Sequence, residues 1–535
     1  MFVQHVKFRP LIRVTAIQQR QQTNAASVNV AETEATDTKR VEWDEARPYK
    51  AIPKVSLAYF VGNMLPGGKY YKKEFDSIMG DLNKRKGNLY RLPGIMGKDE
   101  MLVSNDASHF ERVFRVEGPW PERQGSAILD YHRNKYQKDF YQGVEGLIAT
   151  QAEVWSKFRS AVNPVMMQPK TVRLYYQKMS NVNKEFIQRI RDIRDSTTFE
   201  VPDTFEEEIN RWTLESVSVI ALDKQLGLIN TNRDNPRAKM LFENLTDFFA
   251  LAADIEIKPS LWRYIPTPGF KKMMRILDNI QEVTVSYVNE ALERLEREPS
   301  NKPEHEQSVL EKLLKIDKKV ATVMAMDMLM AGVDTTTTTF TGVLLCLAQN
   351  PDKQAKLREE VLRILPNKDS DFTEASMKNV PYLRACIKEA LRVYPLTSGN
   401  IRVTKSDVII DGYQIPKETA VIMSFLGFNK DDSLYPRSKE YLPERWLRQS
   451  KTEAADGKCP VDLKTTNPFS YLPFGFGPRM CVGKRIVEME LELGIARLIR
   501  NYNVEYNYSM EKPFKNLLIN VPCIPLKFKF TDVEN

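Results

Sequence analysis

A single cysteine in a glycine-rich loop is the strongest chemical signal in the chain. Cys481 lies in the stretch Phe474–Gly483, which also carries three glycines and Arg479. Apolar residues recur at helical spacing directly afterwards, so the thiol is expected just before a helix N-terminus, where partial positive charge favours a thiolate. Glycines let backbone N–H groups turn toward the sulfur, and such hydrogen bonds tune a metal-bound thiolate. The loop therefore predicts a thiolate metal ligand, with Arg479 placed to meet an acidic group beside it.

The alternative for a lone cysteine is a buried residue in a Gly/Pro turn. Here, however, the pattern Phe-x-x-Gly-x-Arg-x-Cys-x-Gly is matched at all five fixed positions, close to the end of the chain. The stretch resembles the haem-ligand loop of the cytochrome P450 family. This resemblance implies that Cys481 ligates the iron of haem b, and that Phe474, Arg479 and Gly483 belong to the haem site.

A second signal is the run Ala331–Thr336 in the middle of a helix expected over about residues 319–349. Five consecutive threonines are poor choices there, each costing up to about 0.7 kcal/mol relative to alanine, so local preference is overridden, as it often is at functional sites. The Thr335 hydroxyl can bond to a carbonyl one turn earlier, and Asp334 beside it adds an acid that can relay protons. Ala331 and Gly332 would let a flat cofactor approach the backbone.

The bland alternative for this run is a polar stretch of a buried helix. Its order, Ala-Gly-x-Asp-Thr-Thr, resembles the oxygen-binding helix of cytochrome P450 monooxygenases. The resemblance implies that Asp334 and Thr335 are catalytic and deliver the protons that dioxygen activation consumes. Family members that isomerise peroxides tend to lose this threonine, so its presence favours true monooxygenation.

Three donors are candidates for a cofactor carboxylate. Trp155 and Arg159 are four residues apart in a helical pattern and therefore share a face. Indole N–H and guanidinium groups only donate, a combination suited to a carboxylate, although ordinary packing is the alternative. The resemblance assigns both residues to a haem propionate, and Arg402, which follows the Pro395 turn, is a further candidate for a propionate.

A charged cluster is expected to stabilise the scaffold. Glu389 and Arg392 are three residues apart in the expected helix Tyr382–Val393, and Arg445 follows about fifty residues later. The resemblance makes these three a buried triad beneath the haem, where loss of one member costs several kcal/mol. Trp446 replaces the phenylalanine that is more usual in the family.

Four basic residues are candidates for docking an electron donor. Arg384 and Lys388 are four apart in the same expected helix, and Lys484 and Arg485 follow Cys481. The resemblance implies a basic patch on the thiolate side that docks an acidic, adrenodoxin-like two-iron ferredoxin, itself reduced by an NADPH-dependent reductase. Ordinary solvated lysine and arginine residues are the alternative.

The substrate is expected to be lipophilic, because the candidate pocket walls are mostly apolar. The stretch Val162–Lys170 resembles the insect mitochondrial branch of the family, whose members act on foreign lipophiles or on steroid hormones. Plain core packing is the alternative for each pocket candidate taken singly. By analogy, the pocket candidates are Met328, Ala331, Leu396, Thr397 and Val521.

Composition favours one large, mainly α-helical domain with small β-sheets, the cytochrome P450 fold, over residues 46–535. No obvious linker divides the 535 residues, and 42% of them are hydrophobic. The formal net charge of +8 is modest for this length and the acidic residues are interspersed, which argues against nucleic-acid binding. The five cysteines show no paired spacing, which indicates a reducing compartment without disulfides.

The first 31 residues have the composition of a targeting sequence. They contain four basic residues and no Asp or Glu, which is typical of a mitochondrial transit peptide, with a disordered basic tail as the alternative. We therefore expect a leader over residues 1–45 and a place on the matrix face of the mitochondrial inner membrane. No run of about 18 apolar residues appears in this leader. The aromatic and basic loop Ser260–Phe270 favours peripheral membrane contact, although it is about equally consistent with a loop packed on its own protein.

The sequence thus predicts a haem-thiolate monooxygenase that oxidises a xenobiotic-type compound or a steroid. Three alternatives stay open at this stage. The first is an ecdysteroid-type hormone hydroxylase, the second is a haem-thiolate isomerase or dehydratase that needs no electron partner, and the third is a non-catalytic haem-binding protein.

Overall fold

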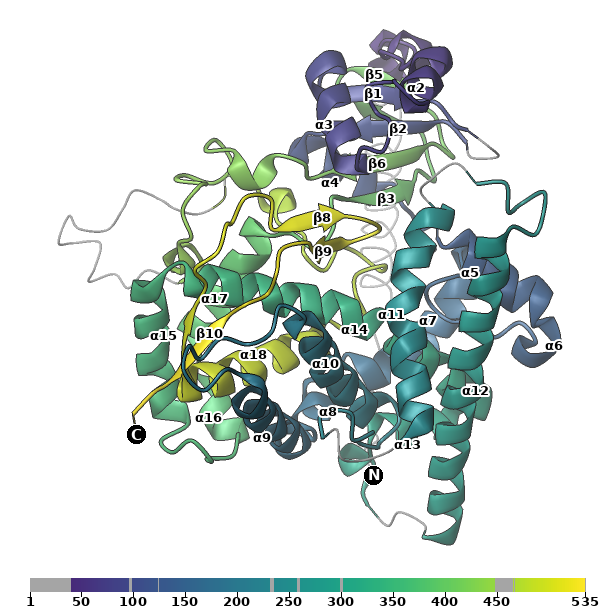
Figure 1. The fold of residues 1–535 in the computed structure, drawn as a ribbon. Helices are drawn as coiled ribbons and strands as arrows, with labels where there is room; N and C mark the ends of the chain where they lie inside the picture. The colour runs from purple at the N-terminus through teal and green to yellow at the C-terminus, as the bar shows by residue number, and fades with distance from the viewer. Residues whose placement is uncertain are drawn as a thin grey trace, which may run out of the picture.

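The computed structural model describes residues 40–95, 99–123, 125–230, 235–256, 260–298, 302–447, 465 and 467–534. Within these residues helices form the bulk of the molecule and the sheets are small (Figure 1). The expected fold class, mainly α with small β-sheets, is confirmed. No helix among them is long and apolar enough to span a membrane.

The main helices, in chain order, are α2 (Leu57–Met64), α3 (Phe75–Lys86), α4 (Ala107–Arg115), α5 (Ala127–Tyr131), α6 (Lys138–Tyr141), α7 (Ala152–Met166), α8 (Pro169–Arg173), α9 (Tyr176–Ile193), α10 (Phe205–Ala221), α11 (Pro236–Glu256), α12 (Pro268–Arg297), α13 (Val309–Ile316), α14 (Lys318–Ala348), α15 (Pro351–Ile364), α16 (Glu374–Lys378), α17 (Pro381–Val393) and α18 (Lys484–Asn501). The short 3-10 and π turns are η1 (Tyr49–Ala51), η2 (His132–Tyr136), η3 (Glu304–Glu306), η4 (Phe428–Lys430), η5 (Pro443–Trp446) and η6 (Pro468–Ser470).

Helix α14 is the axis of the molecule. It has 31 residues, so it is roughly 46 Å long, and it crosses the middle of the fold (Figure 1). Asp317 starts it by accepting a hydrogen bond from Val320 N at 3.0 Å. Helices α10, α11, α12, α13, α15, α17 and α18 all pack against it. Most of its side chains are buried, so the few that are accessible carry information about the site.

The strands are β1 (Leu89–Leu92), β2 (Met101–Ser104), β3 (Gly399–Val403), β4 (Val408–Ile410), β5 (Tyr413–Ile415), β6 (Ala420–Ser424), β7 (Tyr502–Glu505), β8 (Phe514–Asn516), β9 (Asn520–Pro522) and β10 (Lys529–Asp532). The largest sheet has the order β1-β2-β6-β3, with β2 and β6 parallel and the other pairs antiparallel.

This four-stranded sheet separates two small cores. Alternate side chains point to opposite faces, so Leu102 and Val421 pack in one apolar cluster, whereas Val103 and Ile422 pack in the other. The sheet lies with α2 and α3 at one end of the molecule (Figure 1). Its strand β3 positions Arg402, which is paired in register with Val421.

Most expected elements are present. The helix expected over about residues 319–349 is α14, the helix expected over Tyr382–Val393 is α17, and a helix begins three residues after Cys481. The sequence Gly-Pro-Trp-Pro at residues 118–121 breaks regularity and predicts a long irregular stretch after it, which is wrong in part. It contains α5, the π turn η2 and α6, which are too short for their periodicity to be recognised in the sequence.

Several expectations fall on residues outside the described ones, namely the leader up to residue 39 and Cys459. Residues 40–45 are helical, and Gln414 donates a hydrogen bond to the carbonyl of Trp43, so contacts with the main body begin before residue 46. Four cysteines are described, and all four are free thiols.

The charged triad joins α17 to the loop before the cysteine. Glu389 is fully buried. Its carboxylate accepts hydrogen bonds from Arg392 Nε at 3.0 Å and from Arg392 Nη2 at 2.8 Å, and Arg445 Nε lies 3.4 Å from Glu389 Oε1. Trp446 Nε1 also donates to Glu389, at 2.8 Å, so the departure from phenylalanine adds a hydrogen bond to the cluster. Arg392 in turn donates to the carbonyls of Asn429, Ser438 and Glu440. The triad thereby organises the chain from η4 to η5.

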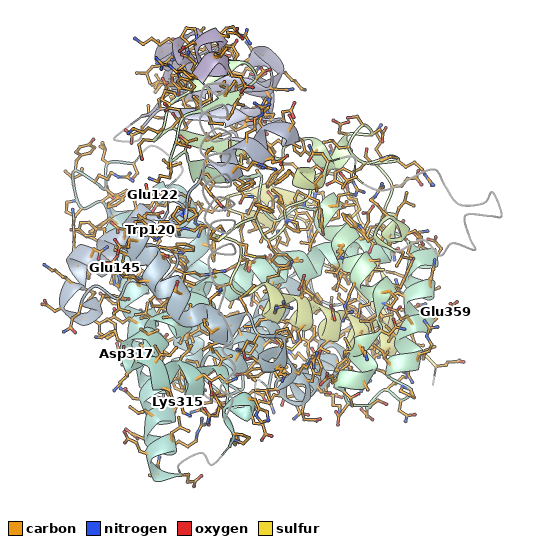
Figure 2. The ribbon with its side chains drawn as sticks, turned by 180° about the vertical axis from the view of Figure 1, so that it is seen from behind. Trp120, Glu122, Glu145, Lys315, Asp317 and Glu359 are labelled. Carbon is orange, nitrogen blue, oxygen red and sulfur yellow. The ribbon has the colours of Figure 1, made fainter. Side chains whose placement is uncertain are left out.

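Replacing Glu389 with alanine should destabilise the fold strongly, because it leaves two buried guanidinium groups without their shared carboxylate. We expect a loss of about 3–5 kcal/mol in the free energy of unfolding. The matched control is Glu359→Ala, since Glu359 is exposed on α15 (Figure 2) and should change stability by less than about 0.5 kcal/mol. Urea denaturation followed by circular dichroism measures both, and equal midpoints for the two variants would show that the triad is not a structural lock.

Candidate active site

Backbone hydrogen bonds shape the loop that carries Cys481. Cys481 N donates to Phe474 O at 2.9 Å, and Met480 N donates to Gly477 O at 3.0 Å. Gly475 and Gly477 both have φ = +72°, a region that residues with a Cβ rarely adopt. A Cβ on Gly477 would also overlap Glu117 Oε1. The glycines are therefore required by the turn itself, which presents the thiol ahead of α18.

The thiol faces accessible space inside the molecule. The Cys481 side chain is accessible, yet protein surrounds it closely enough that burial raises its pKa. Hydrogen bonds from the backbone of Gly483 and Lys484 oppose this increase in pKa, as do the charges of Arg159 and Arg123. These groups favour the thiolate, which is the form that binds metals.

Helix α14 has an accessible face in its middle. Ala331 is exposed and Asp334 and Thr335 are half-buried, although most of the helix before and after them is buried. Thr335 Oγ1 donates to Ala331 O at 2.7 Å, the bond expected from the sequence. The interpretation of Gly332 is corrected: a Cβ there would lie 3.0 Å from Val217 Cγ2, so this glycine serves the close packing of α10 on α14.

The surroundings of the Asp334 carboxyl raise its pKa toward neutral pH. Burial raises its pKa to about 7, and the nearby Glu206 carboxylate contributes to this increase. A carboxyl with a pKa of about 7 is present in both protonation states at neutral pH, which suits proton transfer.

Four arginines surround the cysteine loop with too few carboxylates to balance them. The charges of Arg159 and Arg402 add to burial in lowering the pKa of Arg123 and of Arg479, and burial together with Arg123, Arg402 and Arg159 lowers the pKa of Arg479 to about 9. Buried cations need an anionic partner or hydrogen-bond acceptors. The Nη1 atom of Arg479 is buried and has no hydrogen-bond partner among the described residues. The cluster therefore has unmet capacity for an anion.

Trp155 and Arg159 lie side by side in this cluster. Both are on α7 and both are buried, with the Arg159 guanidinium 6.0 Å from the Trp155 ring centroid. The Arg479 guanidinium stacks on the same ring at 4.1 Å. The structure thus brings together three of the predicted cofactor-binding residues.

Arg402 makes different contacts from those expected. Its Nε donates to Glu117 Oε2 at 2.5 Å, Nη2 donates to Phe476 O at 3.1 Å, and Nη1 donates to Ile401 O at 2.9 Å. All three nitrogens therefore already have protein acceptors, and the side chain ties β3 to the cysteine loop. Direct contact of Arg402 with a propionate stays a prediction.

Comparison with known proteins identifies the family. The family model described as cytochrome P450 matches residues 53–531. The chain belongs to the cytochrome P450 family. The probable mitochondrial cytochrome P450 12a5 of Drosophila melanogaster is 58% identical over 98% of this chain and 97% of its own length. Cytochrome P450 CYP12A2 of Musca domestica is also 58% identical, over 92% of this chain and 93% of its own length.

A solved structure shows the same fold. The crystal structure of the cytochrome P450DA heme domain matches with a TM-score of 0.68 and 17% identity, and it covers 91% of this chain and 98% of that chain. The protein is therefore a cytochrome P450 monooxygenase, whose cofactor is haem b.

The residues present fit haem b. Its two propionates would supply the anions that the arginine cluster lacks, and the unpartnered Nη1 of Arg479 provides a ready donor. Trp155, Arg159, Arg123 and Arg479 would hold the carboxylates, and Cys481 would ligate the iron.

Two residues of this cytochrome P450 site carry no recognisable signal in the sequence. Arg123 lies in the stretch after the Gly118–Pro121 break, where no spacing rule singles out a basic residue. Glu117, which is buried and paired with Arg402, precedes the same break. Glu117 acts through an ion pair with Arg402, and Arg123 acts through its charge on Cys481 and Arg479, all of them hundreds of positions away.

Three of the four basic residues predicted to dock an electron donor lie around one hollow. Arg384, Lys388 and Lys484 line one hollow of about 310 Å³ beside Phe474, whereas Arg485 is exposed nearby in sequence but does not line it. Glu488 and Glu492 line the same hollow, and Glu492 pairs with Arg384 at 2.8 Å.

The predicted pocket residues are partly brought together. Asn520 N donates to Leu396 O at 2.8 Å, which places Val521 of β9 beside Leu396. Leu396 and Thr397 line a small hollow with Pro473, directly before the cysteine loop. Met328 is buried, three residues before Ala331 on α14, so the two share a helical face.

A loop glycine and a helix glycine give a matched pair of tests. Gly477→Ala should lower haem retention and the melting midpoint, because the Cβ meets a positive φ and Glu117. Gly80→Ala is the control, since Gly80 lies within α3 and nothing lies within 4 Å of a Cβ added there. The haem-to-protein absorbance ratio of each purified variant measures the effect, and equal ratios for the two would contradict the assigned role of Gly477.

Proposed function

We propose that this cytochrome P450 is a mitochondrial, ferredoxin-dependent monooxygenase that oxidises a lipophilic small molecule. The observation that carries the proposal is the accessible face of α14, where Ala331 is open, Thr335 is bonded back to its carbonyl and Asp334 has a pKa of about 7. A haem-thiolate isomerase needs no proton donors at this position.

The residues on this face have separate tasks. Haem b, when bound, supplies the oxygen-activating chemistry of the family. Asp334 holds a proton that it can release near neutral pH, and the Thr335 hydroxyl, fixed by Ala331 O, is placed to pass it on. The buried neighbours of this face exclude bulk water from the path.

Asp334 predicts the pH dependence of turnover. Because its pKa is raised to about 7, the carboxyl is protonated below that pH and loses its proton as the pH rises through it. Product formed per electron consumed should therefore fall above about pH 7. Asp334→Asn should slow turnover by about 100-fold and remove this decrease above about pH 7.

The same change at an exposed site of the helix is the control. Asp317→Asn keeps the N-cap of α14 and should leave the pH profile unchanged. An unchanged pH profile in Asp334→Asn would rule out the carboxyl as the proton donor.

Thr335→Ala should uncouple electron use from product, as measured by NADPH consumption against product formed.

The electron donor that fits best is an acidic two-iron ferredoxin, reduced by an NADPH-dependent reductase. Lys388 and Arg485 are exposed, and neither forms an ion pair within the described part of the chain. Arg384 and Lys484, by contrast, have Glu492 and Glu488 as neighbours, at 2.8 Å and 3.9 Å. Lys388 and Arg485 are therefore the better candidates for attracting an acidic partner.

Reversing these two charges should weaken docking without affecting the site. We expect the double variant Lys388→Glu, Arg485→Glu to raise the KM for a two-iron ferredoxin about tenfold at low salt, with kcat restored at saturation. The control is Lys315→Glu, exposed on α13 (Figure 2). Turnover that needs neither ferredoxin nor dioxygen would instead establish the isomerase alternative.

The substrate class follows from the walls and the relatives. Met328, Leu396 and Val521 are apolar, which favours a xenobiotic-type compound or a steroid, and an ecdysteroid-type hormone hydroxylase is the second candidate. Relatives named mitochondrial and the basic leader support a mitochondrial location, on the matrix face of the inner membrane.

Peripheral membrane contact is part of the same proposal. In the loop before α12, Leu261, Tyr264 and Ile265 are 49%, 67% and 55% exposed, a pattern suited to a membrane interface. Trp262 of the same loop is buried instead, where it stacks on Phe270 at 5.9 Å, so the loop has one inward and one outward apolar side.

A further inference from the structure

Carboxylates from three long helices bind one short segment of the chain. The segment Ser126–Gln151 contains α5, η2 and α6, and in Figure 1 it lies on the side of the molecule where α11 and α12 run. We call it the roof segment. Each of α11, α12 and α14 contributes one acidic residue to it. These residues are Glu256, Asp278 and Asp327.

Two of these contacts hold the outer part of the roof segment. Glu256 Oε1, at the end of α11, accepts from Ile128 N at 2.7 Å and from Ser126 Oγ at 3.0 Å. Asp278 Oδ1 of α12 accepts from Gln137 Nε2 at 2.8 Å and lies 3.0 Å from His132 Nε2.

The third contact, at Asp327, is buried. Asp327 Oδ1 accepts from Arg133 Nη2 at 2.7 Å and Oδ2 accepts from Leu147 N at 2.6 Å. Asp327 is 4% exposed and Arg133 is 1% exposed, so water cannot replace either bond. Arg133 also donates to Glu145 O, and Figure 2 shows Glu145 on the flank of the molecule. One carboxylate thus joins η2 and the C-terminal part of the roof segment to α14.

The backbone is shaped around this carboxylate. Gly146 has φ = +82°, and a Cβ there would overlap Asp327 Oδ2 and come within 2.5 Å of Arg133 Nη1. The absence of a side chain at residue 146 is therefore required for the bond between Leu147 N and Asp327.

The roof segment is also pinned at its base. Arg479 Nη2 donates to Thr150 O and to Gln151 Oε1, both at 2.9 Å, and Arg479 Nε donates to Pro121 O at 2.9 Å. The same guanidinium therefore holds the chain on entry to the segment and on exit from it.

Asp327 lies one turn from the accessible face of α14. Asp327 and Ala331 are four residues apart and share a helical face. Met326, beside Asp327, accepts from Tyr141 Oη at 3.7 Å, and Lys319 donates to Phe140 O, so the roof segment runs along the N-terminal half of α14 up to the opening.

We propose that Asp327 is a positioning residue that holds the roof segment closed beside the Ala331 opening, and so limits how fast ligands enter and leave. The inference rests on the proposed function in that it takes this opening as the ligand site. Asp327→Asn keeps the shape but leaves one acceptor oxygen for two buried donors, so one of the two bonds is lost.

The test uses ligand exchange in the purified ferric holoprotein. Imidazole and 4-phenylimidazole bind haem iron through nitrogen and shift its absorbance, which stopped-flow spectroscopy follows. In Asp327→Asn we expect the association and dissociation rates of 4-phenylimidazole to rise together, each by about tenfold, with the Kd changed less than threefold. The smaller imidazole should respond less.

Two further variants make the test independent of one substitution. Gly146→Ala should reproduce the faster exchange from the other side of the contact, and Arg133→Lys should do so because a lysine cannot maintain the fork. Asp317→Asn, the same substitution at an exposed position of the same helix, should behave as the wild type. Should Asp327→Asn fail to retain haem, the other two variants decide by the same two rates.

Hydrogen exchange separates the outcomes. Amides of residues 126–151 should exchange faster in Asp327→Asn than in the wild type, while those of α17 stay unchanged. Wild-type ligand rates in both Asp327→Asn and Gly146→Ala would overturn the proposal, as would a change in the dissociation rate alone, which changes Kd in proportion and indicates a pocket wall. The measurement needs neither ferredoxin nor turnover, so it can fail while the proposed function stands. Failure of the wild type to bind either imidazole would count against the ligand site itself.

Discussion

The guanidinium of Arg479 is the contact on which the site depends. It lies two residues before Cys481, stacks 4.1 Å above the centroid of the Trp155 ring, and donates to the backbone of Pro121 and Thr150. One side chain therefore fixes four parts of the chain relative to one another: the cysteine loop, α7, Pro121 ahead of the roof segment, and the C-terminal end of that segment. Because it is buried, its charge must be balanced within the protein or by the cofactor.

The balance of charge explains why these residues assemble around a cofactor. Among the described residues, Arg123, Arg159 and Arg479 have few carboxylates near them, since Glu117 is paired with Arg402 and Glu122 with Lys405. A buried charged group without its partner is costly. In the protein without haem, the guanidinium groups of the cluster are therefore held together against their mutual repulsion. The two propionates of haem b would relieve this repulsion, and haem binding would thereby be coupled to the stability of the loop that supplies the thiol.

The residues that could be predicted from the sequence are those related by short, regular spacing. The Cys481 loop, the Asp334–Thr335 pair on α14 and the Glu389–Arg392 pair on α17 each follow from positions within one element. Contacts between elements left no such pattern, so Arg123, Glu117 and the bond between Arg133 and Asp327 came only from the structure. Gly332 was misread because a helical glycine serves equally well for a cofactor or for a neighbouring helix. The short helices of the roof segment escaped notice because a single turn has no period to detect.

The most direct test of the account is the carbon-monoxide difference spectrum of the reduced protein, because it reports the atom that ligates the iron. The wild type should show the red-shifted band of a thiolate-ligated haem, and Cys481→Ser should lose that band while the protein remains folded by circular dichroism. A wild-type protein that stays colourless after haem supplementation would contradict the account, as would a red-shifted band that persists in Cys481→Ser.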